Sequence, residues 1–192
     1  AVPYYNNQSI YIQTPRLINK GLNKSDSRCT LELELDKTHL NFYDFLTNID
    51  DFNIIQIQKN SEKWFKQIFP LDVVEEFYKS PIKMARSNKA PVLKLKVPMS
   101  KGNVNCPIFN SMNQTIDFST LKPDTKVLCV LQLSGLRFLK QQVICEWVPI
   151  QMKVFDNSVN NDSKYIIDDT LLSDNEDEDI QISIEEKENL EN

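Results

Sequence analysis

The side chains with the clearest chemical potential in this sequence are cations, and they cluster. No acidic residue lies between Glu76 and Asp117, and a second basic group follows soon after. Clustered lysines and arginines neutralise phosphate groups, so this pattern indicates a surface that binds a polyanion, the alternative being an ordinary solvated basic surface. The candidate phosphate contacts are Lys79, Lys83, Arg86, Lys89, Lys94, Lys96, Lys101, Lys122, Lys126, Arg137 and Lys140.

Aromatic rings occur beside these cations. Exposed rings give nucleobases a surface on which to stack, which suits single strands because their bases are unpaired. The candidate rings are Tyr78, Phe109, Phe138 and Trp147, the last predicted to lie on the more polar face of its strand. Core packing is the commoner role of such rings and stays open for each. Phe138 is the leading candidate because the segment 136–140 is predicted to be a loop between two strands.

The residues that enzymes use are scarce. His39 is the only histidine, so a nucleophile–base pair or a histidine metal site would have to be built around it, and its position at a predicted helix start favours a structural role. Three glycines leave no glycine-rich loop for phosphate. The adjacent acids Asp50 and Asp51 do not face each other on a helix. The sequence therefore predicts a protein that is not an enzyme, with no metal and no cofactor.

The four cysteines are predicted to pack as small buried hydrophobes. Cys29, Cys106, Cys129 and Cys145 form no CxxC pair, and three of them lie in apolar runs. A disulfide between Cys129 and Cys145 is the alternative, and it is disfavoured in an intracellular chain.

The first half of the chain is predicted to combine strands with helices. Residues 9–13 form a strand, and residues 29–35 form another in which Leu31, Leu33 and Leu35 point one way and Glu32 and Glu34 point the other. The apolar residues then recur at helical spacing from residue 38 to the mid-fifties. Residues 62–68 form a short helical piece, and residues 73–78 form another with a capping-box-like start.

The second half is predicted to be β-rich. Residues 92–97 alternate, with Lys94 and Lys96 pointing outward. Residues 126–133 and 141–155 form the two strongest strands, and the second is predicted to place Ile144, Val148, Ile150, Met152 and Val154 on one face. The fold class is therefore a β-rich α+β protein, an OB-like barrel of five or six strands with helices inserted in its first half.

Charge divides the chain into a basic domain, residues 1–155, and an acidic tail, residues 156–192. The tail holds 13 acids against two lysines, which leaves 14 acids and 20 bases in the domain, or +6 against −11. An acidic run such as 174–179 repels itself, so the tail is predicted to be disordered. Its few apolar residues suggest a docking motif for a partner, and a solubilising tail without a partner is the alternative.

Length and hydropathy predict one folded domain and argue against a membrane protein. A chain of 192 residues with 41% hydrophobic residues can form one domain and an appendage. No apolar stretch approaches the roughly 20 residues of a membrane span, and residues 1–14 lack the apolar run of a signal peptide. A cytoplasmic protein without membrane contact is expected.

The order of these segments resembles the OB-fold single-stranded-DNA-binding proteins of large cytoplasmic DNA viruses and cytoplasmic linear plasmids. The matching parts are residues 10–16 (IYIQTPR), the leucine strand at Leu31, the aromatic helix ending near Trp64-Phe65, and Leu121-Lys122-Pro123 followed by the two long strands. The resemblance adds Arg16 to the candidate DNA contacts. The short loop with Arg137-Phe138 departs from it, because a segment bearing tryptophan is expected there.

The resemblance implies a protein that coats and protects single-stranded DNA during replication and hydrolyses nothing. Its acidic tail would compete with DNA and recruit replication proteins. RNA as a ligand and homo-oligomerisation stay open. Two other classes also fit the composition: a viral structural or scaffold protein, which predicts large exposed apolar patches, and an acidic-tailed chaperone, which predicts that function is lost with the tail.

Overall fold

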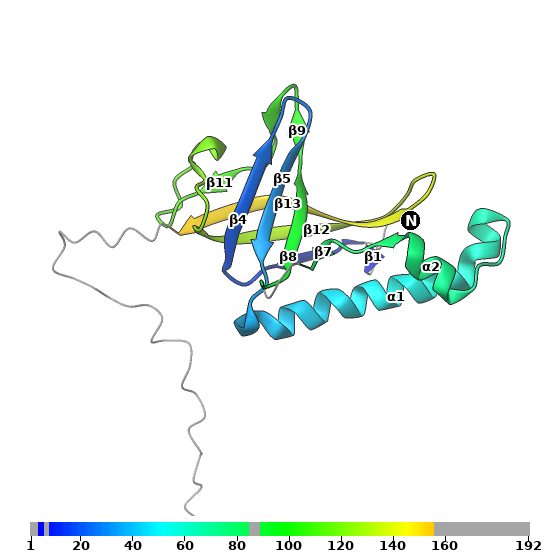
Figure 1. Cartoon of the computed structure of the whole chain (residues 1–192). Helices are drawn as coiled ribbons and strands as arrows, with labels where there is room; N and C mark the ends of the chain where they lie inside the picture. The colour runs from blue at the N-terminus through cyan, green and yellow to red at the C-terminus, as the bar shows by residue number, and fades with distance from the viewer. Residues whose placement is uncertain (1–3, 6–7, 85–88, 156–192) are drawn as a thin grey trace, which may run out of the picture. The chain divides into compact units, whose positions relative to one another are not determined.

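Alternating apolar side chains build the sheet that forms the body of the protein. The computed structural model describes residues 4–5, 8–84 and 89–155. Its main sheet follows the path β11-β13-β12-β4-β5-β8-β7, with β3 paired to β12 and β6 paired to β13. Figure 1 shows β4, β5 and β8 crossing the long β12–β13 pair steeply, so the two groups of strands enclose the core. The long strands are β4 (Leu17–Lys24), β5 (Cys29–Glu34), β8 (Val92–Val97), β12 (Lys126–Phe138) and β13 (Val143–Phe155).

Shorter strands complete the sheet and its connections. In the main sheet, β6 and β11 pair with β13 in parallel, while the other pairings are antiparallel. The β1–β2 and β9–β10 pairs form separate two-stranded sheets. The short strands are β1 (Tyr4–Tyr5), β2 (Gln8–Ser9), β3 (Tyr11–Gln13), β6 (Tyr78–Lys79), β7 (Ile82–Lys83), β9 (Met99–Ser100), β10 (Asn103–Val104) and β11 (Ile108–Phe109).

The core is formed by the strand faces that were predicted to be apolar. Leu31, Leu33 and Leu35 on and after β5 are buried as predicted, as are the alternate residues of β8. All four cysteines are free and buried, which confirms their predicted packing role. The predicted barrel is confirmed only in part, because in the described residues the sheet path ends at β11 and β7 without hydrogen bonds that would close it.

One long helix replaces the two helical pieces predicted between residues 38 and 68. After a short 3₁₀ turn, η1 (Lys37–His39), helix α1 (Leu40–Phe65) runs unbroken for 26 residues. The polar segment near residue 58 looked like a break, but Ile57 and Ser61 are buried and continue the inward face. Helix α2 (Leu71–Phe77) follows Pro70, close to its predicted position. No helix in the described part of the chain has the length and apolar character needed to cross a membrane.

The β12–β13 hairpin corrects two predictions. Strand β12 continues through Gly135 to Phe138, so the predicted loop over 136–140 is wrong. Gly135 has φ 114° and lies at a register shift, where a glycine permits a β-bulge. A second register shift leaves Ile150 between the partners of Val130 and Leu131.

This second shift explains why the predicted face of β13 is only partly right. Met152 and Val154 are buried as predicted, but Ile144 and Val148 are half-buried and Ile150 is exposed. Before the bulge the buried residues of β13 are Val143, Cys145, Trp147 and Pro149. Trp147 therefore faces the core, which corrects its predicted position on the polar face of the strand.

Candidate nucleic-acid interface

Five cations from four strands converge on one groove, which we call the basic groove. Its volume is about 270 Å³, and it runs between β8 and the β12–β13 hairpin. Six of the predicted site residues line it: Lys79, Lys83, Lys94, Lys96, Arg137 and Trp147. Pro81 and Ile144 add apolar surface, and Glu146 is the one acid among the lining residues.

Strand pairing brings these cations together from distant parts of the sequence. Lys94 and Lys96 point outward from β8 because Leu93, Leu95 and Val97 fill the core. Lys79 is placed by the parallel pairing of β6 with β13. Lys83 is placed by the antiparallel pairing of β7 with β8.

The groove cations divide into paired and unpaired groups. Lys94 Nζ lies 2.7 Å from Glu32 Oε1, and Arg137 Nη2 lies 2.9 Å from Glu146 Oε1. Lys79 and Lys83 donate only to main-chain carbonyl groups, of Glu76 and Ser80. These two lysines and Lys96 have no ion pair within the described residues. Within the described part of the chain, three of the five groove cations are therefore free of a direct ion pair.

The basic groove continues into a second hollow along β8. This hollow has a volume of about 330 Å³ and shares Lys96 and Glu146 with the basic groove. Arg28, an exposed residue between β4 and β5, contributes a further cation there. Arg28 was not predicted as a DNA contact because it lies outside the acid-free stretch, close to Asp26.

A buried carboxylate on α1 holds the segment that carries Lys79 and Lys83. Asp50 is 7% exposed, and it accepts hydrogen bonds from the Tyr78 hydroxyl and the Ser80 hydroxyl, both at 2.5 Å. Ser80 Oγ in turn accepts the main-chain N–H of Ile82 at 3.0 Å. Burial raises the pKa of Asp50, and the two hydrogen bonds oppose this shift. Asn53 on α1 also donates to the Tyr78 hydroxyl oxygen at 3.2 Å. Helix α1 thus holds β6 and β7 through the side chains of Asp50 and Asn53.

The other predicted cations lie away from the basic groove. Arg16 stacks on Phe155, with the guanidinium carbon 4.2 Å from the ring centroid. Lys122 and Lys126 lie at or before the start of β12, and Lys101 lies in the β9–β10 turn. Lys140 lies in the β12–β13 loop, and Lys89 lines a separate hollow beside η1. Arg86 lies outside the described residues.

The predicted stacking rings offer little free surface to the groove. Trp147 is 3% exposed and Tyr78 is 7% exposed. Phe138 is 38% exposed, but it packs edge-on against Trp64 and Phe65 at centroid distances of 5.5 and 5.4 Å. Phe109 is half-buried on β11, which pairs with the far end of β13.

The other residue types that enzymes use, histidine and cysteine, have structural roles in the described part of the chain. His39 Nδ1 lies 2.8 Å from Asp36 Oδ1, at the start of the helical segment. The described residues contain no group of histidine, cysteine, aspartate or glutamate side chains arranged to hold a metal ion. Burial raises the pKa of Cys106 and of Cys145 to about 12, so both thiols stay protonated at neutral pH.

The fold is that of phage single-stranded-DNA-binding proteins. The structure of gp2.5, a single-stranded DNA-binding protein encoded by bacteriophage T7, matches with a TM-score of 0.55 and 7% identity over 82% of this chain and 97% of that chain. The C-terminally truncated single-stranded DNA-binding protein of bacteriophage Enc34 matches with a TM-score of 0.50 and 10% identity, over 77% of this chain and 86% of that chain. No curated protein sequence matches the chain. A family model described as "Family of unknown function (DUF5871)" matches residues 22–173.

Proposed function

The chain belongs to the DUF5871 family of unknown function, and we propose that it binds single-stranded DNA along the basic groove. The observation that carries this proposal is the convergence of five cations on one groove between β8 and the β12–β13 hairpin. The fold supports it, because two phage proteins that share this fold are single-stranded-DNA-binding proteins by name.

The groove chemistry suits a flexible strand. Lys79, Lys83 and Lys96 would contact successive phosphates, since none of them forms an ion pair with another described residue. A phosphate can also replace Glu146 as the partner of Arg137. Pro81 and Ile144 offer the bases an apolar surface within the same groove. Contacts of this kind bind the sugar–phosphate backbone with little sequence preference and weaken as salt is added.

This role is that of a coating protein in replication. The chain would bind exposed single strands, protect them and remove hairpins without a catalytic step. We place it with OB-fold binders of viral or plasmid origin that act in the cytoplasm. The acidic tail, residues 156–192, would compete with DNA for the cations and recruit replication proteins. RNA is a second ligand that the same phosphate contacts would accept.

The proposal is tested by fluorescence anisotropy with the full chain. Labelled oligo-dT and a matching duplex are titrated at two salt concentrations. Tight binding to the single strand, weaker binding to the duplex and a loss of affinity at the higher salt are expected. Absence of binding at low salt would overturn the proposal, and equal affinity for single strand and duplex would leave only a general polyanion binder.

A further inference from the structure

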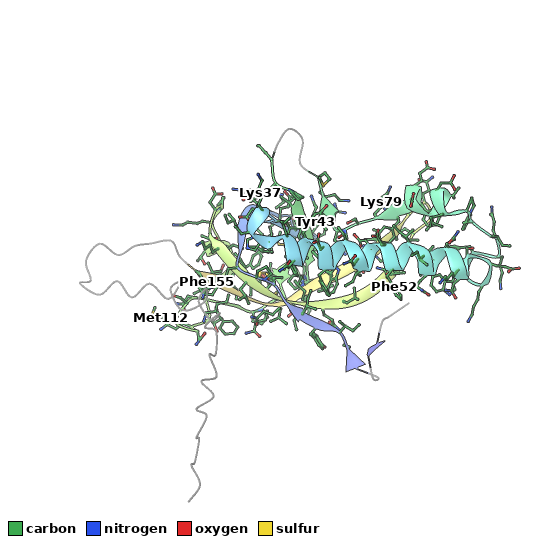
Figure 2. All side chains as sticks on the ribbon, turned by 90° about the horizontal axis from the view of Figure 1, so that it is seen from below. Lys37, Tyr43, Phe52, Lys79, Met112 and Phe155 are labelled. Atoms are coloured by element: carbon green, nitrogen blue, oxygen red, sulfur yellow. The ribbon has the colours of Figure 1, made fainter. Side chains whose placement is uncertain are left out.

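Helix α1 has an outer face that no other described segment covers. Its inward face buries Leu46, Asp50, Ile57 and Ser61 against the body. Viewed from the helix side in Figure 2, α1 lies in front of the sheet, and Phe52 and Lys79 lie on opposite sides of its ribbon. At 3.6 residues per turn, the side opposite the buried row carries Phe52 and Ile55. Phe45 lies at the edge of this side, where its ring centroid is 6.5 Å from that of Trp147.

These three side chains expose much apolar surface. Phe52 is 60% exposed, Ile55 is 42% exposed and Phe45 is 40% exposed. Beside them runs an apolar groove of about 500 Å³ between α1 and β12, with no charged residue among the residues that line it. A contiguous apolar surface of this kind is typical of an interface with another protein, and a strongly charged DNA backbone would gain nothing from it.

Charges are distributed along this helix with opposite signs at its two ends. Asp44 and Asp51 are exposed in the N-terminal half, and Lys59 and Lys66 are exposed at and beyond the C-terminal half. None of these four residues forms an ion pair with another described residue. Asp51 and Lys59 each lie four residues from Ile55, and Asp44 and Lys66 each lie eleven residues from it. If two copies of this helix lie side by side in opposite directions, each of these acids therefore lies opposite a lysine of the other copy.

We propose that the outer face of α1 binds the same face of a second copy of this chain, in an antiparallel arrangement with a two-fold axis at Ile55. In this register, Asp51 lies opposite Lys59 of the second copy and Asp44 lies opposite Lys66 of the second copy. The two Ile55 side chains meet on the axis, with Phe52 of each copy beside them. Glu62 lies opposite Asn48 of the second copy, so no like charges are brought together.

A two-fold interface of this type uses one surface patch twice. It is formed by the side of α1 that carries Phe52, while Lys79 of the basic groove lies on the other side of the helix (Figure 2), so it leaves the basic groove of each copy accessible. The dimer would form without DNA, and it would contain two basic grooves.

The first test is the mass of the full chain by sedimentation equilibrium at micromolar concentrations. A mass near twice the 22.4 kDa of one chain is expected. Phe52→Glu should return it to the mass of one chain, because it places a charge in the apolar centre of the interface. Met112→Glu is the matched control, since Met112 is 71% exposed outside α1, and it should leave the mass doubled. A wild-type chain that stays at the mass of one copy would overturn the proposal.

The second test addresses the register by charge reversal. Asp51→Lys and Lys59→Asp should each weaken self-association about tenfold, because each turns two attractive pairs into repulsive ones. The double variant Asp51→Lys/Lys59→Asp restores opposite charges and should return the dissociation constant to near the wild-type value. A double variant as weak as the single variants, or single variants with no effect, would rule out this antiparallel interface. Circular dichroism confirms that each variant is folded.

Discussion

Glu146 is the residue that most directly limits the charge of the basic groove. Its carboxylate lies 2.9 Å from Arg137, and it lines both the basic groove and the hollow that continues it. A bound phosphate must compete with it for Arg137 and is repelled by it. The sequence did not single out Glu146, because only the pairing of β12 with β13 shows that it faces Arg137.

Replacing this acid should strengthen DNA binding. We expect Glu146→Gln to tighten binding of oligo-dT severalfold at low salt, since it frees Arg137 and removes one negative charge from the phosphate path. The measurement is an anisotropy titration. Glu34→Gln is the matched control, because Glu34 pairs with Lys20 away from the groove and its loss changes the net charge equally. Equal tightening by both variants would contradict a specific role for Glu146.

The candidate site could be predicted from the sequence only in part. Lys94 and Lys96 followed from the alternation of a strand, whose period places every second side chain on the same face. Lys79 and Lys83 followed from the acid-free stretch. Lys122 and Lys126 lie away from these four residues because of the way distant strands pair. A local sequence pattern carries no information on that pairing. Burial of Trp147 likewise depends on the bulge at Ile150.

At the scale of elements, the contact between α1 and the β6–β7 segment positions the groove. Asp50 joins them through Tyr78 and Ser80. Its pKa is raised chiefly by burial and further by the neighbouring Asp51, while the hydrogen bonds from Ser80 and Tyr78 and the charge of Lys83 lower it. In the unfolded chain Asp50 has its ordinary, lower pKa, so the folded state holds its proton to a higher pH.

This difference predicts how stability depends on pH. The contribution of Asp50 to stability is greatest below its unfolded-state pKa and is lost as the pH rises through its raised folded-state pKa. We therefore expect the wild type to lose stability relative to Asp50→Asn as the pH rises from about 4 to about 7. Urea denaturation of both proteins across this range measures the difference. Parallel stability curves for the two proteins would contradict a raised pKa for Asp50.

Strands and helices could be predicted where one face is buried along the whole element, because the apolar residues then recur at a regular spacing. Strands β5 and β8 and helix α2 lie close to their predicted positions. The continuity of α1 was missed because its polar middle hides the buried Ile57 and Ser61. Strand β4 was missed because its Asn, Lys and Gly residues have low strand propensity. Its pairing with β5 and β12 outweighs that propensity.

At the scale of the whole molecule, charge is divided between residues 1–155 and 156–192. The tail carries a net −11 against +6 for the remainder. Removing residues 156–192 should tighten binding of oligo-dT about tenfold at low salt, and the gain should shrink at high salt because screening shortens the reach of the tail charges. Anisotropy titrations at two salt concentrations measure both effects. Weaker binding by the truncated chain would instead favour an acidic-tailed chaperone.

Two matched triple variants test whether DNA follows the basic groove. Lys79, Lys83 and Lys96 are replaced by alanine in one full-length variant, and Lys122, Lys126 and Lys153 in the other, so that both lose the same charge. Affinity for labelled oligo-dT is measured across a range of salt concentrations. The groove variant should bind far more weakly, and its salt dependence, as the slope of log K against log salt, should fall by about 2, since each lost phosphate contact removes about 0.7. The control variant should keep nearly the wild-type slope. Equal losses in the two variants would contradict binding along the groove.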